Sequence, residues 1–206
     1  MYALVEDNNI TKLINNPKSL VIGDVRYPAK IFSVWSMSEL NAIGIYEVIT
    51  DSSNRKDEKW YINTNESYAF ADNQVTRSWG TATPKAHADS LWTQQDSDDG
   101  DLPSDKSVGD VKVEGLKTQL IRTIKSQAAG ELQNTDWYVV RKADAGTEVP
   151  SAITTHRAAV RTKAAEMETA ITNASDTPAL ETLYTYTEQE DGSVTRPLGE
   201  LPILES

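Results

Sequence analysis

An acidic segment, interrupted by glycine and proline, divides this 206-residue chain into two parts. Residues 86–112 carry seven acidic and two basic side chains, and the run from 94 to 105 is almost entirely polar. Ordering the backbone costs about 1–2 kcal/mol per residue, which a segment with so little apolar surface to bury cannot offset. The sequence therefore predicts an acidic linker over residues 86–112, without regular structure, and a folded module on each side of it.

Residues 1–85 have the pattern of short strands joined by tight turns. The apolar segments 2–6 and 10–14 flank an Asp-Asn-Asn turn, and asparagine tolerates the positive φ angles that a hairpin turn needs. An Asp-Asn pair at 72–73 predicts a second hairpin in the same way. Further strands are expected at 20–22, 30–35, 45–50, 59–62, 67–70 and 74–79.

A short helix interrupts these strands. Ser36 and Glu39 have the spacing of a capping box, in which each side chain satisfies the other residue's backbone N–H. Gly44 suits the left-handed conformation that ends such a helix. We expect residues 1–85 to form a small, antiparallel, β-rich module with this one short helix.

After the linker, apolar residues recur with helical spacing. One helix is expected from about 112 to 132 and another over 151–174, with Ser151 as its N-cap. Two such apolar stripes are buried most simply when the helices pack as an antiparallel hairpin. The fold class is thus α+β, with a C-terminal helical hairpin module over residues 113–186.

Shorter elements complete this module. Thr135 is positioned to cap a helix that stops near Gly146, and Pro178 suits the first turn of another helix. Residues 187–206 contain turn-forming pairs and little periodicity, so they are expected to form an extended arm or a short hairpin.

Composition excludes several kinds of chemistry. The chain has no Cys and only two histidines, His87 and His156, so it lacks the residues of a zinc or iron–sulfur site. The acidic run at 96–101 departs from the EF-hand calcium pattern in the position of its Gly and in lacking the final Glu. No Gly-x-Ser-x-Gly elbow, phosphate-binding glycine loop or distinctive carboxylate pair is present. We therefore expect no metal, no cofactor and no enzymatic activity. His156 is expected on a helix surface or beside a carboxylate.

Charge and hydropathy indicate which classes of partner are not expected. The net charge is −11, which repels phosphate backbones, so we expect no nucleic-acid partner. No apolar run is long enough for a transmembrane helix, and the first residues lack the pattern of a signal peptide, so no membrane insertion is expected.

Aromatic and basic residues are the remaining candidates for a binding surface. Trp35, Trp60 and Trp79 fall on apolar segments of the first module and are expected in its core. Trp92 lies in the polar stretch, where a large ring is either a chance exposed residue or an anchor for a partner.

In the helical module, core packing is the first expectation for Trp137 and partner contact the second; Tyr138 adjoins it. Arg157 and Arg161 are four residues apart on one helix and could pair with Asp136 or Asp144. They either form a solvated face, which is the first expectation, or meet an acidic partner. The candidate partner-binding residues are Trp92, Trp137, Tyr138, Arg157 and Arg161.

The segment from 115 to 186 contains a Leu-x-x-Thr-Asp-Trp sequence at 132–137, followed by an Arg, a Pro and a predicted helix with two arginines four residues apart. With this motif the segment resembles the C-terminal region of small tail proteins of tailed bacteriophages, including tail fibre assembly proteins. In that family a Leu-x-x-Thr-Asp-Trp motif follows a helix and is followed by an Arg, a Pro and a helix with a twin-Arg pattern. The corresponding positions here are Leu132, Thr135, Asp136, Trp137, Arg141, Pro150, Arg157 and Arg161. The opening hairpin and the close of the first module, with Val75, Thr76 and Trp79, are similar to the front end of such proteins.

The resemblance implies a non-enzymatic structural or adaptor protein of a phage tail. Its modules would bind other tail or fibre subunits, and it would be oligomeric within the virion. The alternative is a tail fibre assembly chaperone that acts in the host cytoplasm and leaves the mature particle. This chain departs from the shorter chaperones in its acidic segment and longer first module. A third possibility, an enzyme such as a peptidoglycan hydrolase, is disfavoured by the lack of catalytic residues.

Overall fold

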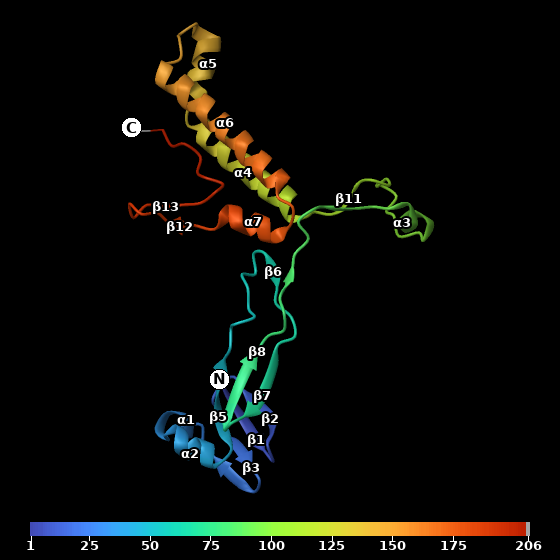
Figure 1. The fold of residues 1–206 in the computed structure, drawn as a ribbon, viewed down its shortest axis with the longest axis vertical. Coiled ribbons are helices and arrows are strands. Elements are labelled where there is room, and N and C mark those ends of the chain that lie inside the picture. The colour runs from blue at the N-terminus through green and yellow to red at the C-terminus, as the bar shows by residue number, and fades with distance from the viewer. Residues whose placement is uncertain (205–206) are drawn as a thin grey trace. The chain divides into compact units, whose positions relative to one another are not determined.

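The computed structural model describes residues 1–204 and has a mixed α+β fold, with a sheet-rich N-terminal region and C-terminal helices (Figure 1). Internal contacts divide the chain into two compact units, Met1–Thr83 and the part from Pro84 onward. The boundary therefore falls two residues before the position expected from the sequence.

The first unit is built on a five-stranded sheet with the order β2-β1-β5-β8-β7. All neighbouring pairs are antiparallel except β5 and β8, which run parallel. The strands are β1 (Tyr2–Glu6), β2 (Asn9–Ile14), β5 (Ile45–Thr50), β7 (Ser67–Ala71) and β8 (Gln74–Ser78). The predicted antiparallel arrangement is thus confirmed for three of the four pairings.

Both predicted hairpin turns are present. Asp7 and Asn8 join β1 to β2 with φ angles of 50° and 62°, and Asp72 and Asn73 join β7 to β8 with φ angles of 51° and 58°. Asp and Asn tolerate this left-handed region better than other non-glycine residues, which explains why they occupy these turns.

Alternate residues of β1 supply two different cores, as the two-residue period of a strand requires. Leu4 packs on one face of the sheet with helix residues Ile31 and Leu40. Ala3 and Val5 pack on the other face with residues of β5 and β8. The sheet is therefore covered on one side by the segment between β2 and β5.

That segment holds a β-hairpin and two short helices: β3 (Leu20–Ile22), β4 (Val25–Tyr27), α1 (Ile31–Val34) and α2 (Met37–Ala42). The strand predicted at 30–35 is wrong, because Ile31, Phe32 and Trp35 turn one face of a helical turn toward the core. The capping box of α2 is confirmed: Glu39 N donates to Ser36 Oγ, and Ser36 N donates to Glu39 Oε2 at 2.8 Å. The backbone N–H and the hydroxyl of Ser36 both donate to the Glu39 carboxylate, and these two hydrogen bonds hold the pKa of Glu39 below its usual value.

The strand predicted at 59–62 is reduced to β6 (Tyr61–Ile62), and β9 (Thr83–Pro84) follows β8 along the chain. Trp60 and Trp79 are buried and Trp35 packs against the first core, so the expectation that these three rings fill the first module is confirmed.

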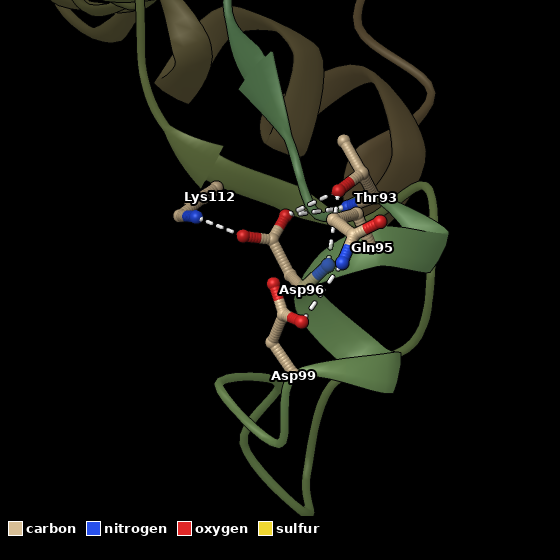
Figure 2. A network of polar contacts seen from close by, with 5 residues as sticks. All are labelled: Thr93, Gln95, Asp96, Asp99 and Lys112. Atoms are coloured by element: carbon tan, nitrogen blue, oxygen red, sulfur yellow. Dashed lines mark hydrogen bonds and ion pairs between the residues drawn. The ribbon is translucent and has the colours of Figure 1, made fainter.

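Residues 86–112 are not the unstructured linker that composition predicts. They contain β10 (Ser90–Leu91) and α3 (Gln94–Asp98), and β10 pairs with β11 (Val111–Val113). Polar contacts rather than apolar burial order this segment (Figure 2). Asp96 Oδ2 accepts hydrogen bonds from the backbone and hydroxyl of Thr93, and its other oxygen accepts from Lys112.

The second unit is dominated by helices α4 (Leu116–Gln133) and α6 (Ser151–Asn173), which lie side by side and antiparallel (Figure 1). Lys117 of the first turn of α4 donates to the carbonyl of Thr172 near the end of α6, and Leu132 accepts from Arg157 at the opposite end. The two predicted long helices are thus present and pack against each other. The seam consists of Leu116, Leu120, Ile124 and Ala128 from α4 and Ile153, Val160, Ala164, Met167 and Ile171 from α6.

Three details at the helix ends differ from the prediction or sharpen it. Helix α4 begins at Leu116 rather than 112, because Gly115 N donates to Asp89 Oδ1 at 2.7 Å and Asp89 also accepts from Thr118. The N-cap of α6 is Pro150 with extended backbone, so Ser151 is already helical. Helix α7 (Thr177–Tyr184) is capped by Asp176, whose side chain accepts from Ala179 N.

Helix α5 (Asp136–Ala145) starts after Thr135 and ends before Gly146, whose φ of 70° is left-handed, so the predicted bounds of this helix are confirmed. The predicted cap is wrong, because the Thr135 side chain makes no capping hydrogen bond and donates instead to the carbonyl of Leu132. After α7, β12 (Thr187–Glu188) and β13 (Val194–Thr195) form the short hairpin that was one of the two expectations for the C-terminal arm. The last two residues of that arm lie outside the described part.

Candidate protein-interaction surface

Arg157 fastens α5 to the α4–α6 pair. Although charged, this residue is only 8% exposed. One terminal nitrogen donates to the carbonyl of Leu132 at 2.8 Å and to the hydroxyl of Thr135 at 2.6 Å, and the other forms an ion pair with Asp136 at 2.8 Å. Because α5 itself has no buried residue, these contacts rather than apolar packing hold its N-terminus in place. We call the contacts of Arg157 with Leu132, Thr135 and Asp136 the clamp.

An aromatic stack projects from the helix that this clamp holds. The rings of Trp137 and Tyr138 have centroids 3.8 Å apart, and the guanidinium of Arg141 lies 4.7 Å and 5.4 Å from them. Trp137 is 51% exposed, and the adjacent Val139 and Val140 are also exposed. Tyr138 is half-buried, so Trp137 is the exposed ring of the pair. Tryptophan, tyrosine and arginine are the residue types that dominate binding energy at protein interfaces. We call Trp137, Tyr138, Val139, Val140 and Arg141 the α5 surface.

A pocket of about 280 Å³ lies next to this surface, between α5, the loop after it and α6. Its cations are Lys142, Arg157 and Arg161, and its one carboxylate is Glu148, which pairs with Lys142 at 2.6 Å. Arg161 is exposed, and among residues 1–204 it forms no ion pair. The pocket is therefore a basic site in an acidic chain.

Trp92 has separate surroundings. Its ring is half-buried under the ammonium of Lys112, 4.5 Å from the ring centroid, and its backbone pairs with Gly109 and Asp110. Lys112 and Thr93 together lower the pKa of Asp96 to about 2. All of these residues belong to segment 86–113, so Trp92 does not join the other four candidates.

Four of the five residues predicted from the sequence thus gather at the α5–α6 end of the helical unit. The first expectation for Trp137, burial in the core, is wrong, because α5 packs no side chain into the seam. A solvated position for Arg157 is also wrong, whereas its pairing with Asp136 is confirmed. His156 is buried rather than on the helix surface, and no described residue forms a hydrogen bond with its Nε2.

Sequence reasoning missed the contact of Arg141 with the two aromatic rings and the structural role of Thr135. Arg141 lies four residues after Trp137, and that spacing places a cation on the same helix face as the ring. Thr135 is 1% exposed and donates to the carbonyl of Leu132, so it closes the turn between α4 and α5. Its acceptor role toward Arg157 depends on the antiparallel packing of α4 and α6, which no local spacing reveals.

The comparisons with protein-family models, curated proteins and solved structures gave no match. Within the described residues, no three His, Asp or Glu side chains are grouped as a metal ion would require. In the same part of the chain, every helix is too short or too polar to cross a bilayer.

Proposed function

We propose that this chain is a non-enzymatic structural or adaptor protein of a bacteriophage tail, and that it binds tail or fibre subunits through the α5 surface. The observation that carries the proposal is the half-exposed Trp137, which lies beside Tyr138 and Arg141 on a helix held by a buried arginine. A rigid aromatic anchor loses little conformational entropy when a partner covers it.

The resemblance supports the same region. Thr135, Asp136 and Arg157 of the family-like motif form the clamp, and Trp137 and Arg141 form the surface. The motif positions thus divide into a group that positions the helix and a group that is presented to a partner. Such a division suits a binding module, because ordering a mobile anchor when the partner binds would cost conformational entropy and weaken the affinity.

The proposal places the protein in the virion and is tested by the protein content of purified particles. We expect this chain at a fixed stoichiometry in tails quantified by mass spectrometry. A phage encoding Trp137→Ala should produce tails depleted of the chain, while Tyr186→Ala, an exposed aromatic outside the α5 surface, should leave its copy number unchanged. Wild-type tails that contain the chain at trace level would contradict a structural role.

The alternative is an assembly chaperone in the host cytoplasm, which the resemblance to fibre assembly proteins favours. It uses the same surface on an unassembled fibre subunit and leaves before the particle is complete. Absence of the chain from mature tails, combined with misassembled fibres in the Trp137→Ala phage, would assign this role.

A further inference from the structure

The basic pocket beside the α5 surface is built by three parts of the chain, each of which contributes a distinct chemistry. Helix α6 supplies guanidinium groups, α5 supplies a valine and an ammonium, and the loop between them supplies a carboxylate and a valine. The residues concerned are Arg157 and Arg161, Val139 and Lys142, and Glu148 and Val149.

Of the three cations in the pocket, Arg161 is the one available to bind a ligand, because the other two are already paired with carboxylates. Arg157 is committed to Asp136, and Lys142 is committed to Glu148. Among residues 1–204, the contact of the Arg161 guanidinium is a long hydrogen bond, 3.4 Å, to the carbonyl of Arg157. The guanidinium is a planar group whose parallel N–H donors match the two oxygens of a carboxylate, so an unpaired arginine at a concave site favours that ligand.

Glu148 shows the kind of group that these cations attract. Its carboxylate reaches Lys142 although its side chain remains 81% exposed, so a carboxylate already lies at the rim. Such an exposed pair contributes little free energy and can be rearranged by a competing ligand.

Size then restricts the ligand. A volume of about 280 Å³ is just below the roughly 300–1,000 Å³ of pockets that hold a whole small molecule, so a single side chain fits better than a cofactor. The two valines provide an apolar wall for the methylene groups of an acidic side chain, and Arg161 provides the charge.

We propose that this pocket binds the carboxylate of an aspartate or glutamate from an acidic segment of a partner polypeptide, while an apolar side chain of that segment packs on Trp137. The inference rests on the proposed binding function and specifies the chemistry of the partner. Arg161 is the specificity-determining residue, because it is the pocket cation without a carboxylate of its own in the described part of the chain.

The test is an NMR titration of the full-length, isotopically labelled chain with a blocked five-residue peptide that contains one leucine and one glutamate. We expect saturable shifts at Arg161 Nε–H and at the amides of Val139 and Val149. The same peptide with glutamine should bind about tenfold more weakly or worse, since it loses a charge-assisted hydrogen bond.

Variants separate the pocket from general charge. Arg161→Gln should weaken the glutamate peptide by about tenfold, whereas Arg122→Gln, an exposed arginine of α4 with the same change in charge, should not. Glu148→Gln should strengthen binding by releasing Lys142, whereas Glu190→Gln, exposed outside the pocket, should not. A heteronuclear spectrum of each variant verifies that the fold is intact.

Two results would overturn the assignment: equal binding of the glutamate and glutamine peptides, or unchanged binding by Arg161→Gln. Self-association of the free chain that Arg161→Gln abolishes would also overturn it, because the carboxylate would then come from a second copy. If the glutamate peptide does not bind while incorporation into tails still depends on Trp137, only this inference fails. If the peptide binds as expected and the chain is absent from tails and their assembly, only the proposed function fails.

Discussion

Replacement of Arg157 by methionine should detach α5 from the rest of the helical unit. The change removes the guanidinium and keeps an unbranched apolar stem in a site that is 8% exposed. Two hydrogen bonds from a charged donor to buried acceptors disappear, one to the carbonyl of Leu132 and one to the hydroxyl of Thr135. Hydrogen bonds of this kind contribute about 1.5–3 kcal/mol each.

For two such hydrogen bonds the total loss would be about 3–6 kcal/mol, and two facts place the expected loss near the lower end. Thr135 still donates to Leu132 after the change, so the two acceptors are not left wholly unsatisfied. The ion pair with Asp136 adds little, because that carboxylate's side chain is 55% exposed and solvent screens it. We therefore expect local opening of α5 to become easier by about 3 kcal/mol, which is roughly a hundredfold in the opening equilibrium.

Hydrogen exchange of the full-length chain, read by mass spectrometry of peptides, measures this opening region by region. Peptides from 134–146 should exchange roughly a hundredfold faster in Arg157→Met, while peptides from the sheet of the first unit serve as an internal reference. Arg161→Met, on the same helix but exposed, is the matched control and should change exchange little. Equal exchange of α5 in the two variants would refute the clamp.

Three further outcomes follow from the described contacts. Gly115→Ala should destabilise the second unit by about 2 kcal/mol or more in a thermal melt, because an added Cβ would lie 2.3 Å from the carbonyl carbon of Ala88. Gly130→Ala, inside α4 with open space around the glycine, should instead stabilise the unit by about 0.5–1 kcal/mol. Stability changes of the same sign in the two variants would contradict this prediction. The pKa of Asp96 is lowered to about 2, so its ion pair with Lys112 should stabilise segment 86–113 fully above about pH 4 and be lost as the pH falls through 2. An NMR titration of the Trp92 indole should report this transition, and Asp96→Asn should abolish it. Ser36→Ala should cost about 1 kcal/mol and increase exchange in α2, and unchanged exchange there would argue against the capping box.

The elements predicted correctly from the sequence are those specified by neighbouring residues. The Asp-Asn turns at 7–8 and 72–73 form hairpins because these residues tolerate positive φ, and the three- and four-residue apolar spacing along α4 and α6 is itself the packed seam. The apolar run at 30–35 was ambiguous, because four apolar residues in six fit both a strand and a helical turn. Only the core beneath α1 decides between them.

The order of segment 86–112 depends on contacts that composition does not record. Asp96 bonds to Thr93 nearby and to Lys112 sixteen residues later, and Asp89 caps α4 through the backbone of Gly115. Composition shows only that the segment has little apolar surface to bury, whereas the structure pairs Asp96 and Asp89 with hydrogen-bond donors. The same limit applies to Arg157, whose burial depends on which carbonyl lies opposite at the end of α4.

The position of β5 determines the order in which the first unit can fold. The β1–β2 and β7–β8 pairs are each closed by a short turn, so each can form from adjacent chain segments alone. Strand β5 lies between them and joins both, antiparallel to β1 and parallel to β8, with residues far apart in the chain. Pairing residues that are far apart in the chain costs loop-closure entropy, which the two hairpins largely avoid. We therefore expect the insertion of β5 between the two hairpins to be the rate-limiting step in folding of the sheet.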